Sequence, residues 1–506
     1  MIYRLSFLLA ALYFLLNALS ATAETLYVSQ SGSGSGTGAD TGNRASSEWF
    51  NTVGNWGVGA GKVSGGDTVS IGGTITTTLS MQGSGTAGSL ITILFETGAK
   101  LSQAASTLMD AQNRSYFVID GGTDGVLENT DNGTGLGSST STSGIYASGA
   151  SYFEIKNLFI KDLYRHTHTN DGSIVFTSHG GIYFNGISGT NSIHNITFSN
   201  ICWCVNVQGA AGVLNLYSNV FQNYDHGFGG GGGLSGLNIY NNHFGSTSNW
   251  DTTINTYHHD GIHTYWAPGG SLHNARIYNN LFDGHWGINN TAHMFFEQNY
   301  STFLATEATN WWVYNNVHIQ SAGNYLNNGF MAFTGNNGVI ANNTYIGASV
   351  TLQAAVSVSG TNTLFQNNVI SGVNRFIAAT GSFTNSGSGL GTNIYAAVAA
   401  GGNTPFAFSS TTYATLALWR TATGGDAASS QVSDALLGAT GVPTSSSLTV
   451  NAGVDLSAYF TTDSDGNTRS GTWDLGAFEY IAPLSPYRGF SFGSGVKLIG
   501  PGRLTQ

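Results

Sequence analysis

Histidine and aspartate are concentrated in the segment "TYHHDGIHTYW", residues 256–266, although only 8% of the 506 residues are Asp, Glu, Lys or Arg. On a helix, the four-residue spacing of His259 and His263 would place both imidazoles on one face, a frequent zinc-binding arrangement. Gly261 and its β-forming neighbours instead favour a strand, on which the two histidines lie more than about 12 Å apart. The segment alone therefore does not predict a metal site.

More titratable residues occur in neighbouring segments of similar pattern. These segments are "SHGGIY" (178–183), "CWCVNV" (202–207), "YDHGFG" (224–229), "HHDGIH" (258–263) and "TAHMFF" (291–296). If they are successive coils stacked about 4.8 Å apart, their histidines and aspartates form one cluster. Aligning the segments and alternating side chains along each strand predicts two outward columns, made of His179, Trp203, Asp225 and His259 and of Tyr183, Gly229, His263 and Phe296. The same alternation turns three residues inward unless a bulge interrupts it, namely His226, Asp260 and His293.

Two carboxylates on adjacent coils, Asp225 and Asp260, indicate acid–base chemistry on a glycosidic bond. The leading prediction is hydrolysis of a polysaccharide with these aspartates as acid and base. The residues predicted to orient them or the sugar are His226, His259 and His263. The residues predicted to contact the substrate are Tyr257, Trp266, His179, His293 and Arg165.

Other chemistries remain open. β-Elimination or epimerisation of a uronate needs a cation beside the carboxylate, yet no Lys or Arg occurs from residue 166 to 275. The nearest cations in the sequence are Lys161, Arg165 and Arg276. Calcium held by Asp171 or Asp225 and backbone oxygens would replace them, and a metal between coils would use Asp225, His226 and His259. The leading prediction includes no metal or other cofactor, and the non-enzymatic alternative is a glycan-binding adhesin or structural solenoid.

A short apolar motif ending in Asn recurs along the chain and predicts the elements that position the cluster. Copies include "LNIYNNHF" (237–244), "ARIYNNLF" (275–282), "WVYNNVH" (312–318), "VIANNTY" (339–345) and "LFQNNVI" (364–370). Two or three strands in each repeat of about 23 residues, without helical periodicity, predict a coil of a parallel β-helix. The recurrent Asn suits a left-handed turn, and its amide can hydrogen-bond between coils.

Both ends of the chain carry a family resemblance. The start "ETLYVSQSGSGSGTGAD" (24–40), the late segment "TTYATLALWRTATGGDAASSQ" (411–431) and the close "DSDGNTRSGTWDLGAFEY" (463–480) resemble the secreted right-handed parallel β-helix proteins of the pectate-lyase-like superfamily. This resemblance implies an all-β, right-handed parallel β-helix. It does not imply one reaction, because such folds carry lyases, hydrolases, epimerases and adhesins. "NYDHG" (223–227) is similar to the N-x-D motif of polygalacturonase-type hydrolases, and "YHHD" (257–260) loosely resembles part of the epimerase pattern.

The sequence also predicts the organisation of the chain. We expect a signal peptide at 1–23, a β-helix domain at 24–480 and a tail at 481–506, which implies a secreted, periplasmic or cell-surface protein. No integral membrane segment is expected in the mature chain. A net charge of −11 without a basic face argues against nucleic-acid binding. We expect a monomer that acts on a polysaccharide, with Cys202 and Cys204 as small buried residues rather than a disulfide.

Overall fold

The computed structural model describes residues 23–482 except for short internal segments. The segments left out are 105, 132–141, 165–179, 210, 248–258, 266–270, 288–289, 297–307, 322–328, 349–353, 381–382, 384–389 and 400–403. The predicted signal peptide and most of the predicted tail therefore lie outside the described residues. Within the described ranges, no helix has both the length and the apolarity needed to cross a membrane.

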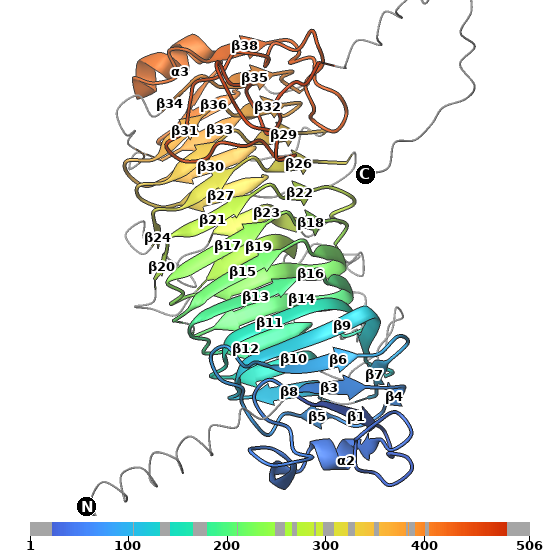
Figure 1. The fold of residues 1–506 in the computed structure, drawn as a ribbon. Helices are drawn as coiled ribbons and strands as arrows, with labels where there is room; N and C mark the ends of the chain where they lie inside the picture. The colour runs from blue at the N-terminus through green and yellow to red at the C-terminus, as the bar shows by residue number, and fades with distance from the viewer. Residues whose placement is uncertain are drawn as a thin grey trace, which may run out of the picture.

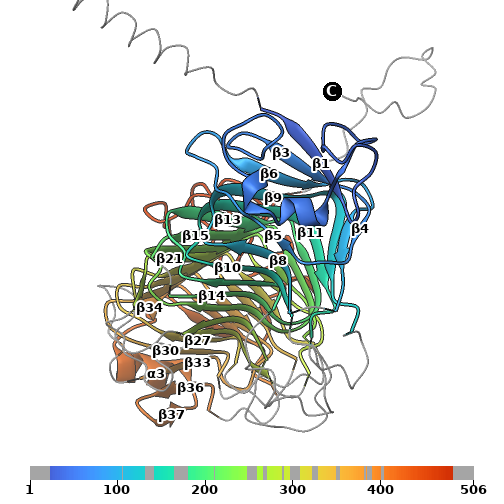
Figure 2. The same ribbon diagram turned by 90° about the horizontal axis from the view of Figure 1, so that it is seen from below.

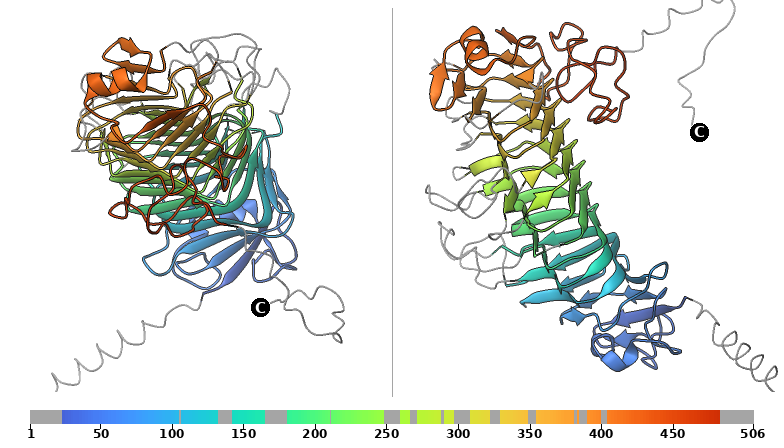
Figure 3. Two further views of the ribbon diagram at one scale, coloured as in Figure 1. Left: turned by 90° about the horizontal axis from the view of Figure 1, so that it is seen from above. Right: turned by 90° about the vertical axis from the view of Figure 1, so that its left-hand side faces the viewer.

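The chain forms a long stack of coils, which runs from the N-terminal end to the C-terminal end in Figure 1. Strands of successive coils pair in parallel and in register, and among the named strand pairs of the described chain only β36 and β37 are antiparallel. The sheets wrap around a common interior, as the end-on views show (Figures 2 and 3). This architecture is the right-handed parallel β-helix that the repeats and the resemblance predict.

The strands form three parallel faces. The first face, which carries the site described below, contains β5 (Leu79–Ser80), β8 (Thr107–Gln112), β10 (Ser143–Ser148), β12 (Ile182–Asn185), β14 (Thr197–Gln208), β16 (Val220–Gly231), β19 (His259–Tyr265), β23 (Asn290–Phe296), β27 (Met331–Thr334), β30 (Val356–Ser359), β33 (Ile377–Ala379) and β36 (Phe406–Phe408). The second contains β1 (Thr25–Ser29), β3 (Thr68–Ile71), β6 (Ile91–Phe95), β9 (Ser115–Glu128), β11 (Ser151–Lys161), β13 (Thr190–His194), β15 (Val213–Tyr217), β17 (Gly236–Tyr240), β21 (Ala275–Tyr278), β25 (Trp312–Tyr314), β28 (Val339–Ala341), β31 (Leu364–Gln366) and β34 (Leu390–Gly391).

The third face contains β4 (Thr74–Ile75), β7 (Lys100–Ser102), β18 (His243–Phe244), β22 (Leu281–Phe282), β26 (Val317–Ile319), β29 (Thr344–Ile346), β32 (Val369–Ser371), β35 (Ile394–Ala396) and β38 (Ser430–Val432). The long strands β9, β11, β14 and β16 bend from one face to the next and so join the faces. The remaining elements are β2 (Ala45–Ser46), α2 (Ser47–Phe50), η1 (Val53–Asn55), β20 (Leu272–His273), β24 (Ala308–Thr309), β37 (Thr411–Tyr413) and α3 (Leu416–Thr423).

Two internal ladders hold the coils in register. Stacked core rings, with adjacent centroids 4.5 to 5.1 Å apart, come from Phe198, Phe221, Phe244, Phe282, His318 and Tyr345. A buried amide ladder, in which each Oδ1 accepts a backbone N–H of the preceding coil, comes from Asn219, Asn242, Asn280, Asn316, Asn343, Asn368 and Asn393. The Asn before several of these has positive φ, for example Asn241 at 55°. The predicted role of the repeated asparagines in turns and ladders is confirmed.

The C-terminal segments that carry the family resemblance contact the β-helix through buried polar groups. Asp426 accepts hydrogen bonds from the indole N–H of Trp419 at 2.6 Å and from the hydroxyl of Tyr395 at 3.0 Å. Arg469 is buried, forms an ion pair with Glu479 at 2.6 Å and donates to Asn315 Oδ1 at 3.0 Å. Asp426 and its partners therefore stabilise the last coils, whereas Arg469 fixes the final segment against the side of an earlier coil at Asn315.

Candidate functional site

Five titratable side chains form one buried group on the adjacent strands β16 and β19. We call this group the His–Asp cluster, and its members are Asp225, His226, His259, Asp260 and His263. Asp225 lies between two imidazoles: its Oδ2 is 2.6 Å from His226 Nδ1, and its Oδ1 is 2.6 Å from His259 Nδ1. Both oxygens of this carboxylate are therefore already engaged within the protein.

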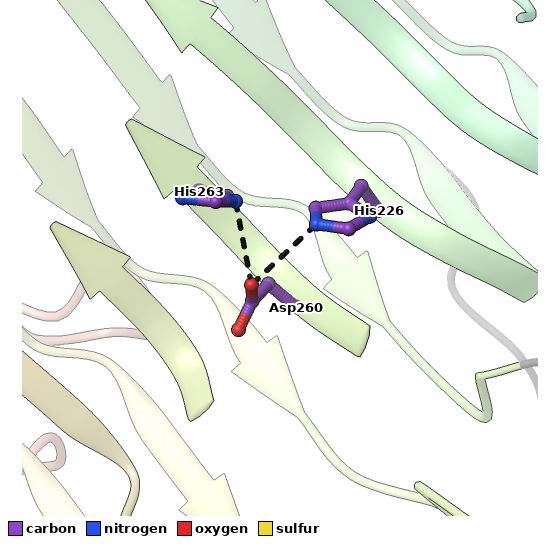
Figure 4. A group of neighbouring side chains, drawn as sticks. All are labelled: His226, Asp260 and His263. Carbon is purple, nitrogen blue, oxygen red and sulfur yellow. Dashed lines mark ion pairs between the residues drawn. The ribbon is translucent and has the colours of Figure 1, made fainter. Parts of the chain in front are cut away.

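Asp260 forms the second centre of the cluster, and its side chain is fully buried. Its Oδ2 lies 3.5 Å from His226 Nε2 and 3.5 Å from His263 Nδ1, as Figure 4 shows. Its Oδ1 accepts the backbone N–H of Ala292 at 3.1 Å. The imidazole of His226 thus lies between the two aspartates and contacts both.

The strand register explains how the cluster forms. His226 pairs with Asp260, and Gly229 pairs with His263, so two neighbouring coils contribute to the same place. Gly261 is required next to Asp260, because a Cβ there would lie 2.6 Å from the carbonyl oxygen of His293 and 3.0 Å from the Trp286 ring. Glycine at position 261 therefore allows β19 to lie close to the next coil, and this close approach keeps Asp260 in the cluster.

A bend in the face separates the cluster from the hydrophobic core. On β14, Cys204 and Val205 are consecutive and both fully buried in the core, so simple alternation of side chains fails there. Trp203, just before them, belongs instead to a small separate apolar group with Cys202 and Tyr265. The same break lets His226 and His263 approach one another although Phe228 and Ile262 point into the core.

Aromatic contacts cover the cluster. The Trp203 ring stacks on His226 with centroids 4.0 Å apart and planes 2° from parallel. His263 contacts Tyr265 at 5.3 Å and Phe295 at 5.1 Å between centroids. These rings limit the motion of both imidazoles and reduce access of water, so the neighbouring charges interact strongly.

The electrostatics of Asp225 follow from its two partners. Burial raises the pKa of this carboxyl, but the neighbouring His226 and His259 outweigh burial and hold the pKa of Asp225 well below its ordinary value. Asp225 is therefore ionised at neutral pH and suited to orienting its two histidines.

The structure corrects the predicted column of residues around this site. Trp203 pairs with His226 rather than with Asp225, and Phe295 pairs with His263 rather than with Ile262. The pairing of β19 with β23 is one residue from the predicted alignment, and it contains a register shift between His259 and Asp260. His226 and Asp260 follow the exception allowed in the sequence analysis, because a break in alternation places both in the cluster.

His293 has a different location from the one predicted for a substrate contact. It is fully buried in the core, where its Nδ1 lies 3.1 Å from His318 Nδ1 and its ring packs 4.2 Å from that of Trp286. Burial lowers the pKa of His293 to about 3. The predicted role of His293 in substrate binding is therefore wrong, because polysaccharide cannot reach this position in the folded protein. The other predicted substrate contacts lie outside the described residues, namely Tyr257, Trp266, His179 and Arg165.

An open trough lies along the first face and begins at Phe295, whose ring contacts His263. It has a volume of about 670 Å³. Its floor continues the register column of His263 through Phe295, Ala332, Ser357, Ala378 and Ala407. Small side chains at four successive positions of this column leave the space that makes the trough.

Arg375 lines the trough and was missed in the sequence analysis. Its guanidinium donates to the carbonyl oxygen of Thr404 at 3.2 Å, which fixes its position. The sequence does single out Arg375 in one respect, because no other Lys or Arg occurs between Arg276 and Arg375. Arg276 itself lies on the second face and stacks over the Trp312 ring at 3.7 Å, while Lys161 pairs with Glu128 at 2.9 Å.

No protein-family profile and no curated protein sequence matches the chain. Among solved structures, the chain is similar to the pectate lyase Pel9A, with 16% identity, a TM-score of 0.39, and coverage of 91% of this chain and 97% of that one. It is also similar to a GH136 lacto-N-biosidase from Eubacterium ramulus, with 10% identity, a TM-score of 0.46, and coverage of 81% and 67%.

A third similar structure is a family 28 exopolygalacturonase from Yersinia enterocolitica, with 13% identity, a TM-score of 0.36, and coverage of 77% of this chain and 78% of that one. Similarities this distant do not identify a reaction. The parallel pairing of its own strands and their stacking into coils assign the chain the right-handed parallel β-helix fold.

Proposed function

We propose that this protein is an enzyme that cleaves a polysaccharide bound along the trough of the first face. One observation carries this proposal: an open trough of small side chains follows one register column and begins at Phe295, whose ring contacts His263 at the edge of a buried His–Asp cluster. Burying several titratable groups together is unfavourable unless they are paired, and such groups are concentrated at functional sites. A trough of this form suits an extended chain ligand better than a compact one.

The contacts favour proton transfer by imidazole over the predicted pair of carboxylates. Hydrolysis by two carboxylates needs a sugar and, in inverting enzymes, a water between them. Here the ring of His226 fills the space between Asp225 and Asp260, and both oxygens of Asp225 contact histidines. We therefore revise Asp225 from an acid or base to a residue that positions His226 and His259.

β-Elimination on a uronate-containing polysaccharide is the reaction that the geometry supports best. That reaction needs a base for the proton next to the carboxylate and a positive charge to stabilise the developing anion. His263, held beside Asp260, is the candidate base. Arg375 lies four coils further along the first face, about 19 Å away at about 4.8 Å per coil, so it would bind the carboxylate of another sugar of the same polymer. Hydrolysis is the second candidate, because Asp260 lies beside two imidazoles in the cluster.

The test is incubation of the full chain with a panel of uronate-containing and neutral polysaccharides. Ultraviolet absorbance of unsaturated uronate and the appearance of reducing ends are followed together. Both signals on a uronate polymer support elimination, and reducing ends without absorbance support hydrolysis. If neither signal appears on any polymer, the enzyme proposal fails and a binding or structural role is favoured.

Two arginine variants test whether the substrate binds in the trough or elsewhere on the surface. Arg375→Ala is expected to raise KM on the anionic polymer by about tenfold or more, because one charge-assisted contact contributes about 1.5 to 3 kcal/mol. Arg276→Ala is the matched control, since it removes an arginine from a different face. Equal kinetics for the two variants would contradict binding in the trough.

A further inference from the structure

We propose that His226, Asp260 and His263 bind a divalent transition-metal ion, for which zinc is the best fit. One potential ligand atom from each of the three side chains lies within 4.8 Å of the other two, and all three residues are buried. Figure 4 shows both imidazoles directed at the same carboxylate of Asp260. The metal site considered from the sequence consisted of Asp225, His226 and His259. The site proposed here keeps His226 and has Asp260 and His263 as the other two ligands.

The separations between these atoms match a coordination site. Asp260 Oδ2 is 3.5 Å from His226 Nε2 and 3.5 Å from His263 Nδ1. An ordinary N–H···O hydrogen bond has a mode of about 2.9 Å. Ligands at about 2.0 to 2.1 Å from a tetrahedral zinc ion lie about 3.3 Å from one another, which is close to the separation seen here.

The surroundings of the three residues also fit a metal centre. Metal-binding histidines usually contact a carboxylate through the ring nitrogen that does not face the metal, which fixes the tautomer. Asp225 holds His226 Nδ1 at 2.6 Å in this way and leaves Nε2 directed at Asp260. The backbone N–H of Ala292 holds the other oxygen of Asp260. The three side chains are thus oriented by their neighbours before any ion binds.

The donor set selects the kind of metal. Two imidazoles and one carboxylate, with a position left open, are typical of catalytic zinc and of non-haem iron(II) sites. Calcium prefers six to eight oxygen ligands, so this set disfavours it. Asp225, the described residue considered for calcium in the sequence analysis, has both oxygens on histidines.

A bound ion would change the charge of the site. It would place positive charge at the end of the trough, within the stretch from 166 to 275 that contains no Lys or Arg. That charge would stabilise an anionic substrate group, while the ring nitrogens of His226 and His263 that face Asp260 would be used in coordination. The metal inference does not depend on the proposed polysaccharide activity, because its test measures bound metal without any glycan.

The experiment uses the full chain, stripped with a chelator, dialysed and titrated with Zn²⁺ or Co²⁺. We expect one metal ion per chain by elemental analysis, and with Co²⁺ the intense visible absorption of a four-coordinate site. His263→Gln and Asp260→Asn are expected to lower affinity at least 100-fold. Asp225→Asn keeps all three ligands and is expected to weaken binding about 10- to 100-fold, as for other residues that orient metal ligands.

His243→Ala is the matched control, because His243 contacts Asp283 at 2.6 Å on another face of the molecule. The control should keep the wild-type stoichiometry and affinity. The proposal is overturned if the wild-type chain binds no stoichiometric Zn²⁺ or Co²⁺, or if the ligand variants and the control bind equally. Should a ligand variant fail to fold, the cobalt spectrum of the wild-type chain still decides the outcome, since a weak octahedral spectrum would contradict two bound imidazoles in a tetrahedral site.

Discussion

Two histidine pairs lie on consecutive coils of this protein, and their surroundings give them opposite properties. His226 and His263 face carboxylates in the His–Asp cluster. His293 and His318, which we call the core histidine pair, contact each other and the rings of Phe282 and Phe330. The comparison teaches that a buried histidine becomes a candidate functional group when charged partners hold it, and a packing residue when aromatic rings do.

The largest expected effect comes from removing the carboxylate that two cluster histidines share. Asp225→Ala should lower the free energy of unfolding by about 3 to 5 kcal/mol, because breaking a buried ion pair leaves its partners without compensation. Chemical denaturation in the presence of a chelator measures this change without a contribution from bound metal. His318→Phe, which extends the ladder of stacked rings, is expected to change stability by less than about 1.5 kcal/mol. If both substitutions have the same effect, the two histidine pairs do not differ as described.

Gly261 lies between the two regions and tests the close approach of the coils. Gly261→Ala places a Cβ 2.6 Å from the carbonyl oxygen of His293, and such overpacking should cost about 1 to 3 kcal/mol. Gly54→Ala is the control, since a Cβ at Gly54 meets no atom within 4 Å. Thermal unfolding of both variants measures the difference, and a neutral Gly261→Ala would mean that β19 and β23 pass further apart than in the structure.

The core histidine pair predicts a loss of stability in mild acid. Burial lowers the pKa of His293 to about 3 and that of His318 well below its usual value. The unfolded chain therefore binds these protons first, so the contribution is fully present above about pH 6.5 and is lost as pH falls towards about 3. Each histidine contributes a slope of at most about 1.4 kcal/mol per pH unit in that window.

The control for this pH dependence removes both ionisable groups while keeping rings in place. Denaturation curves from pH 7 to about 4 should show a shallower slope for the double variant His293→Phe and His318→Phe than for the wild-type chain. Tyr345, which stacks on His318, is neutral throughout this range because burial raises its pKa. An unchanged slope in the double variant would assign the acid sensitivity to other residues.

The smallest effect is expected at a His–Asp pair on the surface. His243 contacts Asp283 at the same 2.6 Å distance as the pairs of Asp225, but both side chains are about one third exposed, at 37% and 33%. Solvent screens such pairs, so His243→Ala should change the free energy of unfolding by less than about 1 kcal/mol. Urea denaturation of His243→Ala and of Asp225→Ala compares their free energies of unfolding. A larger loss in Asp225→Ala would show that burial, and not distance, determines how much such a contact stabilises the protein.

The sequence predicted the site only in part. It identified the segments that carry Asp225, His226, Asp260 and His263, because titratable residues are rare elsewhere in the chain. It did not identify which of them face one another, since a one-residue error in register exchanges the two sides of a strand. It also placed His293 with them, although that residue lies in the core and the pairing of β19 with β23 is one residue from the predicted alignment. Arg375 was missed because more than 100 residues separate it from His263 in the sequence, whereas the coils bring both to one face.

The sequence by itself determined the repeating coil. Regularly spaced apolar residues and asparagines are local signals, and each coil needs its neighbours to bury its apolar side chains, so repetition leads to a parallel β-helix. Only the tertiary structure decided which histidines join carboxylates and which join the core. That choice depends on the bend at Cys204 and Val205 and on the passage of Gly261 beside the next coil. Both features are set by packing between coils, and the spacing of residues along the sequence does not reveal that packing.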